Sequence, residues 1–137
     1  MEHRRRQSIA IYHAPGSERL ERLAGFLDDL SADALTFCCW YSRGKGCAVG
    51  LAAAMNPWFR AQGLRLESAE SVKDCRPVYR NHSDWQAVAT FFGLTNEDAR
   101  ALFDRGGYGG QARPHPRQVA RKIRAHLKAS ELHAIPA

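Results

Sequence analysis

The last quarter of the sequence most constrains what this chain can fold into. From about Pro116 to Leu132, apolar and cationic side chains separate onto different sectors when residues are placed about 100° apart on a helix. Such separation is typical of an amphipathic helix that packs one face on a core and exposes the other. The apolar sector holds Val119, Ala120, Ile123 and Leu127.

A separate sector of this predicted helix carries a row of cations that we call the basic stripe. Its members are Arg117, Arg121, Arg124 and Lys128, with Arg113 in line just before the helix. The four helical members fall within an arc of about 60°. Such a row suits a nucleic-acid backbone, where each neutralised phosphate releases counterions. It equally suits an acidic protein surface, including the acidic first helix of the same chain. A third alternative is that the row is only a solvated face without a partner.

The charge is spread unevenly along the chain. The net charge is +6, and residues 113–137, with six cationic side chains and one acidic, carry +5 of it. Residues 17–36 carry five acidic side chains against two basic ones. This uneven distribution says more about possible partners than the overall charge of the chain does.

The predicted fold class is mainly α, with about five helices and at most a short β-hairpin or strand pair. A chain of 137 residues fits one compact domain, residues 1–137, with residues 1–8 and 133–137 expected to be flexible. Ser17, Thr95 and the capping box that begins at Ser83 are expected to start helices. The helices are predicted at about 17–30, 47–55, 83–92, 95–103 and 116–132.

Composition favours a cytoplasmic protein without a membrane segment. No apolar run approaches the roughly 18–20 residues that span a bilayer. The apolar segment behind the basic N-terminus is too short for a signal peptide and ends at Pro15. The four cysteines, Cys38, Cys39, Cys47 and Cys75, follow no disulfide framework and are expected to be thiols.

Several runs occur in a recognisable order. These are residues 39–54 with Cys47-Ala48-Val49-Gly50, Pro-Trp-Phe-Arg at 57–60, Phe-Phe-Gly-Leu-Thr at 91–95, Leu-Phe at 102–103 and Val-Ala-Arg-Lys-Ile at 119–123. The order resembles small uncharacterised bacterial and phage proteins that carry a Cys-Gly-Thr-x-x-Cys-x-x-Gly segment. Ser-Arg-Gly-Lys-Gly at 42–46 stands here where the Cys-Gly-Thr would be. The resemblance covers residues 37–127 and implies no activity.

Cys47 is the main candidate for catalysis. It follows a Gly-Lys-Gly loop and begins a predicted helix, where the helix dipole, Lys45 and Arg43 would favour a thiolate. A cysteine hydrolase or acyltransferase needs such a nucleophile and a base, for which His82 and His115 are available. The alternative is a small buried residue in the core, the usual place for a free cysteine.

No metal or cofactor is expected. Cys39 and Cys47 are separated by seven residues, and Cys75 and His82 by six, whereas zinc ligands pair at shorter spacings. The glycine-rich segment 106–110 lacks the phosphate-loop pattern and is predicted to be a flexible linker. Trp40, Trp58 and Trp85 are expected in the core.

Taken together, these patterns predict a small, non-catalytic accessory or regulatory protein of bacterial or phage origin. It would bind an acidic partner, namely nucleic acid, a nucleoprotein complex or an acidic protein, through the basic stripe. The first alternative is the cysteine-dependent enzyme centred on Cys47. The second is a structural subunit that makes its contact through Pro57-Trp58-Phe59.

Overall fold

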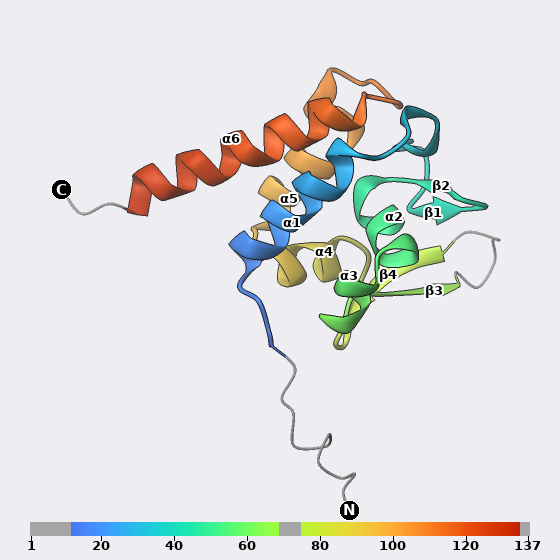
Figure 1. Cartoon of the computed structure of the whole chain (residues 1–137), viewed down its shortest axis with the longest axis horizontal. Coiled ribbons are helices and arrows are strands. Elements are labelled where there is room, and N and C mark those ends of the chain that lie inside the picture. Colours follow the sequence, from blue (N-terminus) through green and yellow to red (C-terminus); the bar gives the residue numbers. More distant parts are fainter. Residues whose placement is uncertain (1–11, 69–74, 135–137) are drawn as a thin grey trace, which may run out of the picture.

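The computed structural model describes residues 12–68 and 75–134 (Figure 1). Within these ranges it has six α-helices: α1 (Gly16–Asp28), α2 (Ala48–Met55), α3 (Pro57–Ala61), α4 (Asp84–Phe92), α5 (Asn96–Phe103) and α6 (Pro116–Ala134). Two short 3-10 helices, η2 (Ala32–Ala34) and η3 (Arg105–Tyr108), lie between them. The flexibility predicted for residues 1–8 falls outside the described residues, as does that of 135–137.

The β structure is larger than the predicted hairpin or strand pair. In the part of the chain that the structure describes, five antiparallel strands form one sheet in the order β2-β1-β4-β3, with β5 paired to β4. They are β1 (Tyr41–Ser42), β2 (Lys45–Gly46), β3 (Arg65–Ser68), β4 (Cys75–Tyr79) and β5 (His82–Ser83). The fold is therefore rich in helix but mixed. Strands of two to five residues are too short for alternation to reveal them in a sequence.

Helix ends follow the sequence in part. Thr95 caps α5, accepting a hydrogen bond from the Asp98 amide at 3.0 Å, and Gly93 ends α4 with a φ of 66°, as predicted. Ser17 lies inside α1, whose N-cap is Pro15, so the predicted Ser17 cap is wrong. Ser83 is the N-cap of α4 but its side chain makes no capping bond.

The predicted capping box at Ser83 fails for a backbone reason. Asp84, the first residue of α4, has a φ of 55°, which departs from the helical geometry that places the third amide over a cap hydroxyl. Gln86, the other member of the box, instead donates to the Thr90 hydroxyl at 3.4 Å.

The glycine-rich segment 106–110 is not a simple linker. Part of it forms η3, and the buried Tyr108 donates its hydroxyl hydrogen to the Leu102 carbonyl at 2.8 Å. The flexible-linker prediction was wrong because it relied on the glycine content and took no account of Tyr108, which anchors the segment to the core.

Helix α2 lies within the hydrophobic core, where Ala48 through Ala53 are all buried. Its small side chains allow the backbone before β1 to come very close. A Cβ added at Gly50 would lie 1.8 Å from the Trp40 carbonyl oxygen. Glycine at this position therefore fixes how α2 and the chain before β1 pack together.

Replacing Gly50 with alanine is expected to destabilise the fold strongly. The obstructing atom is backbone, which cannot swing away, so the loss should reach or exceed the ~1–3 kcal/mol typical of overpacking. Gly25, inside α1 with nothing within 4 Å of its added Cβ, is the matched control. Gly25→Ala should gain about 0.5–1 kcal/mol through helix propensity. Urea unfolding measures both, and equal effects would contradict this packing.

A buried cation joins four elements of the structure. Arg19 of α1 is only 4% exposed, yet within the described residues it pairs with no carboxylate. Its guanidinium donates to the Phe91 carbonyl at 2.9 Å, to Gln62 Oε1 at 3.1 and 3.3 Å and to the Tyr79 hydroxyl at 3.3 Å. It also lies over the Phe91 ring, 4.2 Å from the centroid. Neutral acceptors and an aromatic face thus replace a counterion.

Replacing Arg19 with methionine should lower the free energy of unfolding by about 2–4 kcal/mol, since it removes charge-assisted hydrogen bonds and leaves buried acceptors unpaired. Arg19→Lys should recover less than half of the loss, because one ammonium cannot reproduce the planar fork of donors. Arg22→Met is the control: that exposed cation stacks on Trp58 at 4.5 Å and should cost under about 1 kcal/mol. If Arg19→Lys left the free energy of unfolding measured in urea unchanged, the proposed role of the planar guanidinium would be contradicted.

Candidate functional site

Helix α6 is the long amphipathic helix predicted from the sequence, and it packs along α1 (Figure 1). Val119, Ala120 and Ile123 are fully buried, and Leu127 packs against the core from its edge. The first turns of α6 lie over the rest of the molecule, whereas its C-terminal end projects beyond it (Figure 1). The basic stripe lies on a separate, exposed sector of the helix.

One member of the basic stripe is tied to the acidic first helix. Arg124 makes two parallel hydrogen bonds to Asp28 of α1, at 3.2 Å and 2.7 Å, and lies 3.8 Å from Glu21. This hydrogen bond from Arg124 is the main cause of the lowered pKa of Asp28. For Arg124, the acidic first helix of the same chain, one of the alternatives considered for the stripe, is therefore the partner.

The other members of the stripe divide into two groups. Arg113 donates to the Asp33 backbone carbonyl at 3.2 Å, close to the start of α6. Arg117, Arg121 and Lys128, which we call the outer cations, are exposed. Across residues 12–68 and 75–134, none of their side chains makes a hydrogen bond or ion pair. They are the part of the stripe available to another molecule.

Sequence reasoning missed the structural role of Lys122. Its ammonium donates to the Ala101 carbonyl at 2.8 Å and to the Gly107 carbonyl, and lies 4.5 Å from the centre of the Tyr108 ring. Burial lowers the pKa of this ammonium. Lys122 thus anchors α6 to the end of α5 and to η3, although its charge resembles that of the stripe.

A second candidate site is a pocket of about 470 Å³ that we call the thiol pocket. All four cysteines line it, brought there from the turn before β1, the start of α2 and the start of β4. The rings of Trp40 and Trp85 meet edge to face in its wall at 4.8 Å. The remaining lining residues are Phe37, Arg76, Asp84, Phe103 and Asp104.

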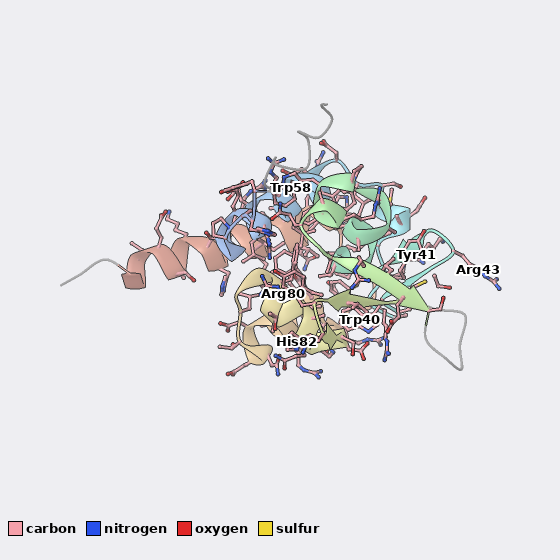
Figure 2. All side chains as sticks on the ribbon, turned by 90° about the horizontal axis from the view of Figure 1, so that it is seen from below. Trp40, Tyr41, Arg43, Trp58, Arg80 and His82 are labelled. Carbon is pink, nitrogen blue, oxygen red and sulfur yellow. The ribbon has the colours of Figure 1, made fainter. Side chains whose placement is uncertain are left out.

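Cys47 lines this pocket as the buried N-cap residue of α2, and its burial argues against a role as a nucleophile. The residue is 3% exposed, and its sulfur accepts a hydrogen bond from the Gly50 amide at 3.4 Å. Burial raises the pKa of its thiol to about 12, opposite to what a thiolate requires. Arg43, expected to favour the thiolate, points away from the body at the β1–β2 turn (Figure 2).

Neither candidate base is paired with Cys47 in the part of the chain that the structure describes. His82 lies half-buried in β5, next to the turn that joins it to β4 (Figure 2). His115 uses its Nδ1 atom to accept the Arg117 amide at 3.1 Å, at the start of α6. The pairing of a nucleophile with a base, which this enzyme hypothesis needs, is not assembled.

Cys38 has the environment that was expected at Cys47. Its side chain is exposed, and the Arg105 guanidinium donates to its sulfur at 3.5 Å. The pKa of the Cys38 thiol is lowered, first by a hydrogen bond with Thr36 and then by the charges of Arg105 and Arg113. Sequence reasoning missed this because 67 positions separate Arg105 from Cys38.

Within the described residues, no group of three or more His, Cys, Asp or Glu side chains is arranged to hold a metal ion. No helix among these residues has the length and apolar character needed to cross a membrane. Phe59 is fully buried, and Arg22 covers the ring of Trp58 at 4.5 Å, so much of the Pro57-Trp58-Phe59 segment packs within the chain.

The ion pair between Asp28 and Arg124 gives a pH-dependent prediction. Because the pKa of Asp28 is lowered on folding, the pair stabilises the protein above the unfolded value near ~3.9 and is lost as pH falls through the folded value. Asp28→Asn should therefore cost under about 1 kcal/mol at pH 7, the range for solvent-screened pairs, and almost nothing near pH 2. The neighbouring, exposed Asp29→Asn is the control. A loss that persists at low pH in urea unfolding would contradict the ion-pair explanation.

The similarity of the chain to bacterial and phage proteins remains a prediction from sequence. Comparison with protein-family models, with curated proteins and with solved structures finds no match to this chain.

Proposed function

We propose that the protein is a non-catalytic accessory or regulatory protein that binds an acidic macromolecule through the outer cations of α6. The observation that carries the proposal is that Arg117, Arg121 and Lys128 are exposed and make no side-chain hydrogen bond or ion pair within the described residues. Arg124 in the same row is paired with Asp28, on which the charge of Arg117 also acts from a greater distance. The bacterial, plasmid or phage setting expected from the sequence belongs to the same proposal.

The form of this surface favours an extended polyanion. At about 1.5 Å per residue, the outer cations follow roughly 16 Å of helix from Arg117 to Lys128. A nucleic-acid backbone presents its charges at regular intervals over such a length, and arginine donors match phosphate oxygens. Nucleic acid is therefore the first class to test, followed by a nucleoprotein complex or an acidic protein.

The docking of α6 supports the same proposal. Arg124 and Lys122 hold the helix to α1 and to η3, so the outer cations lie on a fixed support. Charges fixed in place lose less side-chain and segmental entropy on binding than charges on a mobile tail. The pair at Asp28 also keeps the acidic surface of α1 partly neutralised, which reduces repulsion of a polyanion.

Charge reversal at the outer cations tests this function. Fluorescence anisotropy with labelled duplex DNA and single-stranded RNA measures the association constant at several salt concentrations. For three phosphate contacts, its logarithm should fall with log salt at a slope of about −3 for the duplex and about −2 for the single strand. Arg121→Glu should weaken binding and flatten the slope by about one. Arg65→Glu, an exposed change of equal charge on β3, is the control and should behave like the parent protein.

Two results would contradict the proposal. If Arg65→Glu and Arg121→Glu weaken binding equally, only net charge matters and α6 is not the site. If neither nucleic acid nor poly-glutamate binds at 50 mM salt, the outer cations form only a solvated face. If the parent protein bound poly-glutamate but not nucleic acid, and Arg121→Glu abolished that binding, the proposal would stand with an acidic protein as the partner.

A further inference from the structure

The thiol pocket is separate from the basic stripe and has features that the proposed binding function does not use. Its volume of about 470 Å³ lies within the range of small-molecule sites, and tryptophan and phenylalanine rings form much of its wall. Cys47 also lines the pocket, but burial makes its thiol inert. The exposed Cys38 leaves one accessible sulfur beside a cation.

We propose that the thiol pocket is a modification site in which Cys38 accepts one half of a small zwitterionic disulfide. The Cys38 thiolate attacks one sulfur of the disulfide and forms a new S–S bond with that half. The original S–S bond breaks, and the other half leaves as a thiolate that takes a proton from water. Cys38 is oxidised and the incoming disulfide is reduced, so the step needs no other oxidant.

The choice of Cys38 follows from access and electrostatics. The Arg105 guanidinium, 3.5 Å from the sulfur, stabilises the thiolate that must attack. Each unit by which a thiol pKa falls raises the thiolate fraction about tenfold but reduces its intrinsic nucleophilicity about threefold. The net gain in rate at neutral pH is therefore modest, about threefold per unit. The raised pKa of Cys47 instead lowers its thiolate fraction and slows its reaction with a disulfide.

The choice of a zwitterionic disulfide follows from the charged groups around the pocket. Asp104 lines it, and its carboxylate makes no hydrogen bond or ion pair across residues 12–68 and 75–134. This carboxylate suits an ammonium group. Arg105 has further donors that suit a carboxylate. Arg76 is already paired with Glu67 at 2.9 Å and with Asp84 at 3.5 Å, so it forms a neutralised part of the wall.

The experiment uses the reduced full-length protein with cystine as the zwitterionic probe and bis(2-hydroxyethyl) disulfide as the neutral one. Mass spectrometry of intact protein and of peptides follows the adduct at pH 7. We expect the first adduct on Cys38, formed roughly three to ten times faster than in urea-unfolded protein. Cys38→Ser should lose this fast adduct, whereas Cys75→Ser should keep it.

Two further variants separate activation of the sulfur from recognition of the probe. Arg105→Met should slow both probes about threefold and raise the pH midpoint of the reaction. Arg65→Met, an exposed change on β3 outside the pocket lining, should change neither the rate nor the midpoint. Asp104→Asn should slow cystine but leave the neutral disulfide unchanged. Circular dichroism confirms that each variant is folded.

Three results would overturn the proposal. The first is initial modification at a cysteine other than Cys38. The second is a native rate no higher than that of the unfolded chain. The third is a rate for cystine that Asp104→Asn does not alter, which would refute the zwitterionic class of substrate.

Discussion

A buried arginine without a carboxylate partner is the interaction on which much of this structure depends. Arg19 reaches from α1 to the end of α3, to β4 and to α4, and it does so with hydrogen bonds to neutral oxygens and with aromatic contacts. Removing a cation from water is costly, so those acceptors must be in place together. The Gln62 oxygen that serves Arg19 also accepts the Ala14 amide at 2.8 Å. The chain entering α1 is thus positioned by the same group of contacts.

Close backbone packing provides the second constraint and connects the fold to the thiol pocket. The Trp40 carbonyl accepts the Cys47 amide at 3.1 Å and lies where side chains at Gly46 and Gly50 would have to go. This contact sets the turn before β1 against the start of α2. The Trp40 ring then meets Trp85, and Cys38 lies just outside. Small residues in α2 are therefore responsible for the shape of the pocket as well as for the core.

The sequence predicted those features that depend on neighbours along the chain. The position of α6, the cap at Thr95 and the end of α4 at Gly93 follow from helical spacing and local hydrogen bonds, which a sequence displays directly. The sheet, five-stranded in the described residues, was underestimated because its strands are short and because the pairing that unites them, β1 with β4, spans α2 and α3. The Arg105–Cys38 contact was missed for the same reason. A charge brought close by folding leaves no local pattern in the sequence.

The local sequence around Cys47 also led to a wrong prediction, because burial outweighs the groups that would favour a thiolate there. A cysteine at a helix start beside cations suggests a thiolate, and Cys47 does cap α2. The helix dipole, however, contributes only about 0.3–1 kcal/mol at an exposed position, whereas removing an anion from water costs several kcal/mol. Desolvation therefore decides the protonation of Cys47. The same comparison explains Cys38, where exposure keeps desolvation small enough for Thr36 and Arg105 to prevail.

The basic stripe shows how one row of like residues can serve two purposes. Arg124 lies at the edge nearest the apolar face, so folding brings it to the carboxylates of α1, whereas Arg121 and Lys128 point further outward. The difference arises because successive members of the row are rotated by tens of degrees about the helix axis. Pairing Arg124 reduces repulsion within the row and helps to hold α6 on α1. The cations left outside can then act on another molecule without undoing the contact that positions them.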